Sequence, residues 1–255
     1  MAARLRLIGM WIATGALLSG MVFAGWTGFS WIQQITLSDV AIQGNVNTTE
    51  SDIRDIIRVD TSMVLYDISA VVLEDRLIRH PWIRQADVAR LPSGVLDIRI
   101  DERKPVAVLL GSNDRPDTWV DAAGWRLPIT DRAAYDVPIL DMNLGPWHPM
   151  KPIMDPSTRE LLRALAGTSE EMDALFSEFI RVDSGWELRT TPVAGHHSIP
   201  VLLGASDFAL KFQMLQGFWN EQVLQHRNKE FILIDLRFDS QIVVREQHMR
   251  NASSS

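Results

Sequence analysis

The residues that could do chemistry in this chain are few and stand far apart. The run Gly204-Ala205-Ser206-Asp207-Phe208 begins like the turn that presents a nucleophilic serine, but it lacks the closing glycine of that motif. His196-His197 could bind a metal, yet no carboxylate or third histidine stands at a ligand spacing beside the pair. We therefore expect Ser206 to cap a helix and the two histidines to lie in an exposed loop.

Cysteine and the common catalytic motifs are missing from the sequence. Without cysteine the chain can form no disulfide, thiolate nucleophile or cysteine-based zinc site. It contains no Ser-x-x-Lys, His-Glu-x-x-His, Walker loop or Gly-x-Gly-x-x-Gly. Scattered Asp and Glu residues could form an acid pair in space, but most such residues are solvated surface. The sequence thus favours a protein that is not an enzyme, with no catalytic residues, metal or cofactor.

The balance of charge is acidic. The formal net charge is -7, whereas a protein that binds nucleic acid through phosphates needs a basic face. The same balance argues against a polybasic module that binds a membrane surface. We therefore expect no nucleic-acid partner, and no motif indicates a small-molecule substrate.

Residues 7–32 form an apolar segment without any charged side chain, directly after Arg4 and Arg6. A run of about 20 apolar residues is enough to cross a bilayer as a helix. No Lys or Arg follows until Arg54, so the positive flank predicts that residues 1–6 are a short cytoplasmic tail. Everything after the segment would then lie outside, which in a bacterium is the periplasm.

A cleaved signal peptide is the alternative for this segment. Such a peptide has a shorter apolar core and a small-residue cleavage site, and Phe23-Ala24-Gly25 is a poor match. Trp26, Phe29 and Trp31 crowd the outer end, where an aromatic belt would lie at the lipid headgroups. The length and the flanks together favour the anchor.

The next 70 residues or so predict a small α+β layer. Residues 40–43 read as a strand that ends at the turn Gly44-Asn45. Thr49-Glu50-Ser51-Asp52 has the form of a capping box and opens a helix. Ser69 should cap a second helix, which His80-Pro81 ends.

Two strands complete this layer. In the second, Leu96, Ile98 and Ile100 alternate with residues 97, 99 and 101, which are all charged. We expect the aliphatic side chains to face the helices and the charged ones to face water. The order strand, helix, helix, strand, strand predicts two helices on one face of a three-stranded sheet.

The remaining chain reads mostly as strands with a few helices. Ala122-Ala123-Gly124 suits a hairpin turn, Asp155 opens one helix, and Ser206 should cap another that runs from Asp207 to about Gln225. The last two strands are expected at residues 231–238 and 241–246, joined by Asp239-Ser240. The final strand would be the edge of the sheet, open to an incoming strand.

A set of short segments lies along the chain in a characteristic order and spacing. They are Ile42-Gln43-Gly44-Asn45, His80-Pro81-Trp82-Ile83 with Ala86, Val88 and Arg90, residues 101–107, Val120-Asp121-x-x-Gly124 and residues 234–239. Together they resemble the FtsQ/DivIB family of bacterial cell division proteins, which carries a POTRA domain, and the resemblance covers nearly the whole chain. Phe238 stands where the family often has tyrosine, and its members usually have a longer cytoplasmic tail.

The resemblance implies an α+β protein with a single transmembrane helix at 7–32, a POTRA domain at 35–107, a mostly antiparallel β domain at 108–250 and a polar tail at 251–255. It implies a bitopic inner-membrane scaffold of the divisome at the division septum. Its partners would be FtsB and FtsL, through them FtsW and FtsI, and also FtsK. We expect FtsB to bind by strand addition at residues Arg237, Phe238, Ser240, Gln241, Ile242, Val243, Val244 and Arg245.

Other interpretations stay open at this point. A POTRA-bearing translocation or assembly factor would need several such units or a long barrel, and an anchored cell-wall hydrolase would need a recognisable catalytic set. Trp82 could anchor a partner, but we favour a core position beneath the sheet. Arg237 could be a binding hot spot, or it could pair with Asp235.

Overall fold

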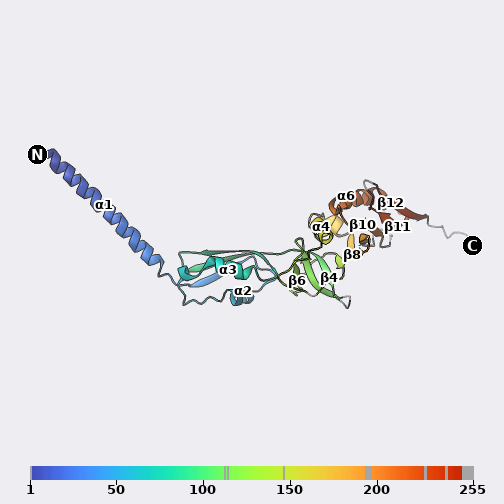
Figure 1. Ribbon diagram of the computed structural model, residues 1–255, viewed down its shortest axis with the longest axis horizontal. Helices are drawn as coiled ribbons and strands as arrows, with labels where there is room; N and C mark the ends of the chain where they lie inside the picture. Colours follow the sequence, from blue (N-terminus) through green and yellow to red (C-terminus); the bar gives the residue numbers. More distant parts are fainter. Residues whose placement is uncertain are drawn as a thin grey trace, which may run out of the picture. The chain divides into compact units, whose positions relative to one another are not determined.

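The computed structural model describes residues 2–111, 113, 115–145, 147–192, 197–226, 229–238 and 241–248, with side chains from residue 9 to residue 246. The chain divides into two compact units (Figure 1). Unit 1 comprises the chain up to Ile78 and Ile83–Glu102. Unit 2 comprises Arg79–Trp82 and the chain from Arg103 onward. The segment Arg79–Trp82 therefore packs with unit 2, although the residues before and after it in the sequence belong to unit 1.

Helix α1, Ala2–Ile32, contains an apolar stretch of 24 residues, Gly9–Ile32, that is long and apolar enough to cross a membrane. At about 1.5 Å per residue this stretch spans roughly 36 Å, somewhat more than a hydrocarbon core of about 30 Å. The hydroxyls of Thr14 and Thr27 donate to the carbonyls of Met10 and Phe23 at 2.9 and 3.0 Å. These polar side chains are thereby satisfied within the helix, as lipid surroundings require.

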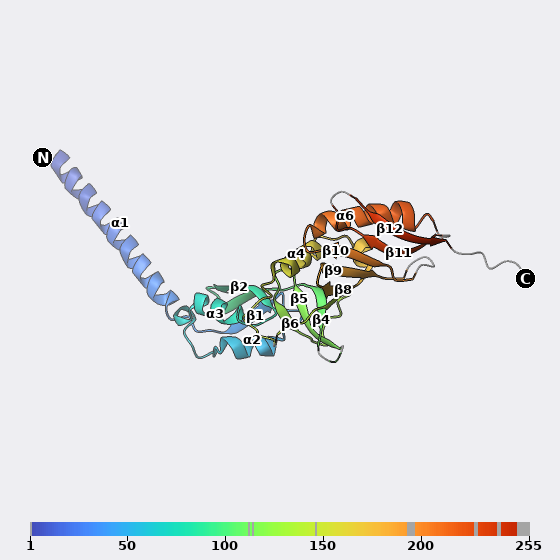
Figure 2. The same ribbon diagram turned by 45° about the vertical axis from the view of Figure 1, so that its right-hand side comes forward.

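Unit 1 contains a three-stranded sheet in the order β1-β3-β2, with β1 parallel and β2 antiparallel to β3. Helices α2 and α3 contribute to the same core as the sheet (Figure 2). The predicted order of strand, helix, helix, strand, strand is confirmed. The elements of this unit after α1 are β1 (Asp39–Gln43), α2 (Glu50–Ile57), a 3-10 turn (Leu65–Asp67), α3 (Ala70–Leu77), β2 (Ile83–Arg90) and β3 (Val95–Glu102).

The alternation along β3 is confirmed on its apolar side and wrong at one polar position. Leu96, Ile98 and Ile100 all belong to the core of unit 1. Asp97, expected to face water, is only 8% exposed, and its carboxylate pairs with the Arg99 guanidinium at 3.2 Å. Because β3 is the central strand, Asp97 lies between Ala41 of β1 and Ala89 of β2 and has a neighbouring strand on each side. A polar residue on a central strand can therefore be buried even where one sheet face is open.

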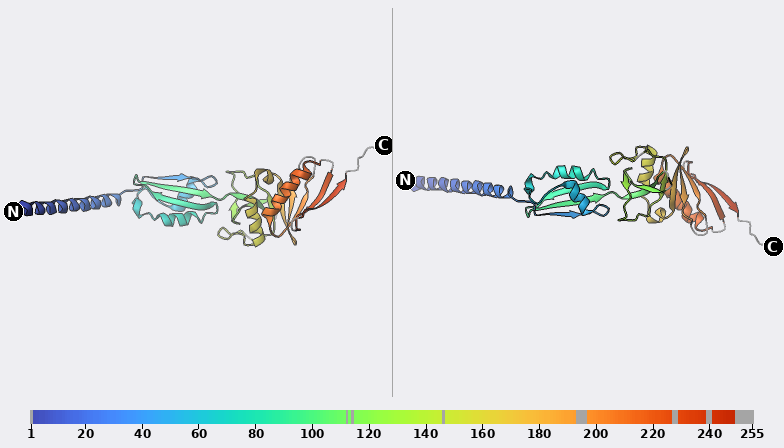
Figure 3. Two further views of the ribbon diagram at one scale, coloured as in Figure 1. Left: turned by 90° about the horizontal axis from the view of Figure 1, so that it is seen from above. Right: turned by 90° about the horizontal axis from the view of Figure 1, so that it is seen from below.

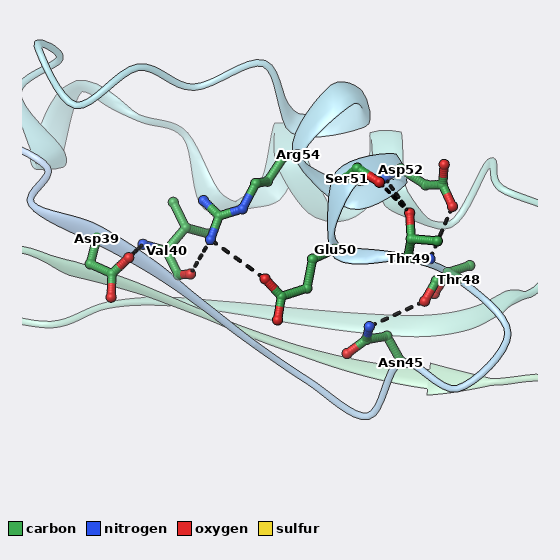
Figure 4. A network of polar contacts seen from close by, with 9 residues as sticks. All are labelled: Asp39, Val40, Asn45, Thr48, Thr49, Glu50, Ser51, Asp52 and Arg54. Atoms are coloured by element: carbon green, nitrogen blue, oxygen red, sulfur yellow. Dashed lines mark hydrogen bonds and ion pairs between the residues drawn. The ribbon is translucent and has the colours of Figure 1, made fainter.

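The start of α2 has the predicted capping box (Figure 4). The Thr49 hydroxyl accepts from the Asp52 backbone N–H at 2.8 Å, and the Asp52 carboxylate accepts from the Thr49 N–H at 2.9 Å. Arg54, on the same helix, donates to the Val40 carbonyl at 3.1 Å and so ties α2 to β1. Ser69 holds the N-cap position of α3 as expected, but its side chain makes no capping bond.

The Glu102 carboxylate, at the end of β3, holds the loop between β1 and α2. One oxygen accepts from the Thr48 hydroxyl at 2.6 Å and the other from the Asn47 backbone N–H at 2.7 Å. The backbone N–H groups of Val46 and Thr48 donate as well, at 3.1 and 2.9 Å. Burial alone would raise the pKa of Glu102, but the hydrogen bonds from Thr48 and Asn47 outweigh it and hold the pKa below its ordinary value.

Unit 2 is built on one mixed, mostly antiparallel sheet of nine strands in the order β12-β11-β10-β9-β8-β7-β4-β5-β6. Helix α6 lies across one face of the last strands (Figure 3). The elements are β4 (Pro105–Leu110), β5 (Pro116–Asp121), β6 (Arg126–Pro128), β7 (Ile139–Asp141), α4 (Pro156–Leu165), α5 (Glu170–Asp173), β8 (Phe176–Val182), β9 (Gly185–Thr190), β10 (Pro200–Gly204), α6 (Phe208–Phe218), a π-helix (Trp219–Val223), β11 (Lys229–Asp235) and β12 (Val243–His248).

The expected hairpin around residues 122–124 is confirmed, whereas the expected cap of the helix after Ser206 is wrong. Strands β5 and β6 pair around the predicted turn, where Gly124 has φ +89 and an added Cβ would lie 3.1 Å from the Ile153 carbonyl oxygen. The predicted cap at Ser206 is wrong, because the N-cap is Asp207, in the left-handed region at φ 61. The Ser206 hydroxyl instead contacts the Asp207 carboxylate at 2.7 Å. The helix also changes to π geometry at Trp219.

Trp82 is a core residue, as favoured from the sequence, but its neighbours differ from those expected. It is 1% exposed and belongs to unit 2 rather than to the core of unit 1. Its indole N–H donates to the Pro128 carbonyl at 3.1 Å, and its ring stacks on Tyr135 with centroids 6.2 Å apart. The expected position beneath the three-stranded sheet is therefore wrong.

We predict that Glu102→Gln destabilises unit 1 by about 1–2 kcal/mol at pH 7, because an amide can no longer accept from every donor around it. The folded carboxyl has the lower pKa, so its contribution is present above the unfolded pKa of about 4.3 and is lost as pH falls through the folded pKa. Amide hydrogen exchange of residues 39–102 in the intact protein would measure the difference.

The gap in exchange protection between wild type and Glu102→Gln should close as the pH falls through that range. Asp55→Asn, the same carboxyl-to-amide change at an exposed position of α2, is the control that should change little at either pH. A gap that is absent at pH 7, or that stays constant into acid, would contradict the role of the ionised carboxylate.

Candidate partner-binding edge

Strand β12 is the end of the nine-stranded sheet. Within the part of the chain that the structure describes, its strand partner is β11 on one side, and no strand covers the other side (Figure 3). An edge of this kind presents unpaired backbone N–H and C=O groups to the surroundings. The edge predicted for the last strand is present in the fold.

The structure places the predicted binding residues on a strand and on the loop before it. Val243, Val244 and Arg245 lie on β12. Arg237 and Phe238 follow the end of β11, and Gln241 and Ile242 precede β12. Ser240 lies outside the described residues, as does Asp239. The expected two-residue connection is wrong, because β11 ends at Asp235 and β12 begins at Val243.

An ion pair explains why β11 ends early. The Asp235 carboxylate accepts from the Arg237 backbone N–H at 3.0 Å and from its guanidinium at 2.9 and 2.6 Å. This geometry turns the chain directly after the strand. The Asp235 carboxylate accepts the backbone N–H two residues onward, which would otherwise bond to a neighbouring strand. The hydrogen bonds from Arg237 hold the pKa of Asp235 below its ordinary value despite burial. Arg237 therefore pairs with Asp235, which is one of the two alternatives considered from the sequence; the other was a binding hot spot.

The direction of each backbone group on β12 follows from the pairing of β11. The Leu236 N–H donates to the Leu202 carbonyl on β10 at 2.9 Å, so Leu236 points toward β10. Neighbouring residues of a strand point their backbone groups to opposite edges, so Asp235 points toward β12. Asp235 lies opposite Val243 and Ile234 opposite Val244. The backbone of Val243 therefore bonds to β11, and that of Val244 points away from the sheet.

This alternation continues along β12. Arg245 pairs inward like Val243, and Glu246 points outward like Val244, since the irregularity in this hairpin falls between Phe231 and Leu233 on β11. The groups directed toward an incoming strand are thus the N–H and C=O of Val244 and Glu246 and, by the same alternation, of His248 at the end of β12.

The side chains of β12 alternate between the two faces of the sheet. Val244 is half-buried and packs against the core of unit 2, as does Ile242 just before the strand. Val243 is 47% exposed, and Arg245 is exposed. Phe238, on the preceding loop, is 52% exposed. An added strand would therefore meet an apolar side chain on each face of this edge.

Charge is distributed unevenly along the edge. The Glu246 carboxylate pairs with Lys229 on β11 at 3.4 Å. Arg245 has no ion-pair partner among the described residues, so its charge remains available beside the open edge. Lys229 was missed from the sequence; it faces His248, so its pair with Glu246 is a diagonal one across the hairpin, which needs the register to be known.

The other chemistry-bearing residues do not gather into a site. His197 is exposed, and His196 lies outside the described residues. Within the described ranges, no three His, Asp or Glu side chains stand close enough together to hold a metal ion.

Comparison with known proteins identifies the family. Residues 35–103 match the FtsQ-type POTRA domain. The chain is 38% identical to a cell division protein FtsQ from Rhodothermus marinus, over 92% of this chain and 86% of that protein. The chain belongs to the FtsQ family. It is also 31% identical to the FtsQ protein of Salinibacter ruber, over 91% of each chain. A more distant FtsQ, from Koribacter versatilis, is 23% identical over 88% of this chain and 64% of its own length.

Membership makes this a bacterial cell division protein with an FtsQ-type POTRA domain, and the apolar helix α1 fits a membrane-anchored member of the family. The matched POTRA residues cover the part of unit 1 that follows α1, together with Arg79–Trp82 and Arg103 of unit 2. The open edge of β12 lies in unit 2, beyond the matched domain.

We predict that proline has opposite effects at neighbouring positions of β12. Val243→Pro removes an N–H that bonds to β11 and should detach the strand, whereas Val244→Pro removes an outward N–H and should leave the hairpin paired. Hydrogen exchange of the amides in 229–235 checks this, with faster exchange expected only for Val243→Pro. Equal exchange in both variants would contradict the assigned directions.

Proposed function

We propose that this FtsQ-family protein is a non-enzymatic scaffold of the divisome that captures FtsB by adding a strand of FtsB to β12. The observation that carries the proposal is the outward direction of the Val244 and Glu246 backbone groups on an uncovered edge. Backbone pairing supplies affinity in this mode, and alternate side chains supply specificity. FtsL would join through FtsB, and the pair would link the scaffold to the synthases FtsW and FtsI.

The edge also indicates what the incoming strand should look like. Val244 continues the core face of the sheet, and Val243 offers apolar surface on the other face. Arg245 has no described ion-pair partner, whereas Glu246 is compensated by Lys229. The strand that fits has alternating apolar residues and an acidic residue that reaches Arg245, because complementary charges select the partner and fix the register.

Binding of FtsB tests this proposal directly. Val244→Pro should weaken the affinity of the purified full-length protein for the periplasmic part of FtsB at least about tenfold, because one backbone hydrogen bond is lost and the ring obstructs the approach. Val244→Ala is the matched control, since it shortens the side chain but keeps the N–H. It should bind more tightly than the proline variant.

Folding must be verified in the same samples by the exchange measurement on β11. A folded Val244→Pro protein that binds FtsB as tightly as wild type would exclude strand addition at this edge. Equal weakening by alanine and proline would assign the effect to the valine side chain instead.

We further propose that α1 crosses the inner membrane once, with the N-terminus in the cytoplasm and both units in the periplasm at the division septum. The proposal rests on Arg4 and Arg6 before α1 and on the lack of Lys or Arg from there to Arg54. The POTRA domain would then serve localisation and contacts such as those with FtsK.

A topology reporter tests the orientation. Alkaline phosphatase fused after Glu246 should be active, because that enzyme folds only outside the cytoplasm. Exchanging the flanks, with Arg4→Glu and Arg6→Glu combined with Gln33→Arg and Gln34→Arg, should reduce that activity. An inactive fusion to the wild-type chain, or a mature protein lacking α1, would contradict the anchored orientation.

A further inference from the structure

The short segment after α1 is held by two loops of unit 1. The Leu65 N–H donates to the Ile35 carbonyl at 2.8 Å, and the Leu37 N–H donates to the Met63 carbonyl at 2.9 Å. On the other side the Ser38 N–H donates to the Gly94 carbonyl at 2.8 Å. The loops 58–64 and 91–94 therefore lie directly beside residues 35–38.

Each of these loops exposes one large apolar side chain. Met63 is 42% exposed and Leu91 is 40% exposed. Single exposed apolar residues are common on protein surfaces, so neither exposure means much alone. The informative fact is their shared location, one in each of the loops that bond to the segment leaving α1.

Both apolar side chains stand on turns that are internally hydrogen bonded. The Asp60 carboxylate accepts from the Ser62 N–H at 3.0 Å, and the Met63 N–H donates to the Asp60 carbonyl at 3.0 Å. In the second turn the Gly94 N–H donates to the Leu91 carbonyl at 3.0 Å. Gly94 has φ +91, and an added Cβ would lie 3.1 Å from the Thr36 carbonyl oxygen. Both turns are thus fixed before any partner arrives.

The length of chain between α1 and these loops is very short. Helix α1 ends at Ile32, and the Ile35 N–H still donates to the Ile32 carbonyl at 3.2 Å. A fully extended chain gains at most about 3.6 Å per residue, so Ile35 lies within roughly 11 Å of the helix end. A headgroup layer is about 5–8 Å thick on each side of the hydrocarbon core. Ser38, to which the second loop bonds, lies within roughly 22 Å by the same measure, so both loops are within reach of the lipid interface.

We propose that Met63 and Leu91 contact the lipid surface of the membrane that α1 crosses, so that the POTRA domain rests on the bilayer. This inference depends on the proposed membrane anchor. The contact is apolar rather than electrostatic, because the exposed charges of loop 58–64 include both Arg58 and Asp60. It should therefore form equally well on zwitterionic and on anionic lipid.

The lack of cysteine makes single-site labelling direct. Met63→Cys and Leu91→Cys, each carrying an environment-sensitive fluorophore, are inserted as full-length protein into phosphatidylcholine vesicles. Lipids with a nitroxide just below the headgroup then quench the fluorophore on contact. Val46→Cys is the matched control, because Val46 is apolar, 61% exposed and lies past the other end of β1, five residues long, in the same unit. Phe29→Cys, within α1, reports insertion.

Several-fold stronger quenching at Met63 and Leu91 than at Val46 is the expected result, with little change when half of the lipid is phosphatidylglycerol. Quenching at Phe29 but equal, weak quenching at the other three positions would overturn the contact and leave the anchor intact. Absence of quenching at Phe29 as well would overturn both the anchor and the contact. Quenching at Met63 and Leu91 that appears only with phosphatidylglycerol would overturn the apolar mechanism.

Discussion

Every backbone N–H and C=O of this chain needs a hydrogen-bond partner in whatever medium surrounds it, and this constraint shapes each part of the protein. A segment that crosses lipid finds no outside partner and must be a helix; the apolar stretch Gly9–Ile32 is one, with the hydroxyls of Thr14 and Thr27 also bonded within it. In the two sheets neighbouring strands satisfy the backbone. Among the described residues, β12 has a strand partner on one side only, and the proposed binding site rests on that unpaired edge.

Two ionised carboxylates satisfy the constraint where strands stop. Glu102 accepts the N–H groups of the loop between β1 and α2, and Asp235 accepts the N–H and guanidinium of Arg237 after β11. In both cases hydrogen bonds to the charged form outweigh burial and hold the pKa of the carboxyl low. The second pair lies at the end of β11, directly beside the residues that pair with the start of β12.

Features that depend on neighbouring residues could be predicted from the sequence, and features set by distant pairing could not. The capping box of Thr49 and Asp52 and the alternation of Leu96, Ile98 and Ile100 are local and were found. The burial of Asp97 depends on the central position of β3, which a single strand does not reveal. The edge at β12 follows from chain order, but the outward direction of Val244 required the bond between Leu236 and Leu202 on another strand.

An uncovered strand edge invites aggregation as readily as it invites a partner, and the fold limits this in physical ways. The edge is short, since β12 has six residues, so it offers only a short template to a second copy. Charge adds selectivity, because a second β12 placed alongside would have to accommodate another unpaired Arg245 near the first. An acidic strand would be attracted by the Arg245 charge, whereas a second copy of β12 would be repelled by it. The same arginine that discourages self-association therefore favours an acidic strand from another protein, as the proposed scaffold role requires.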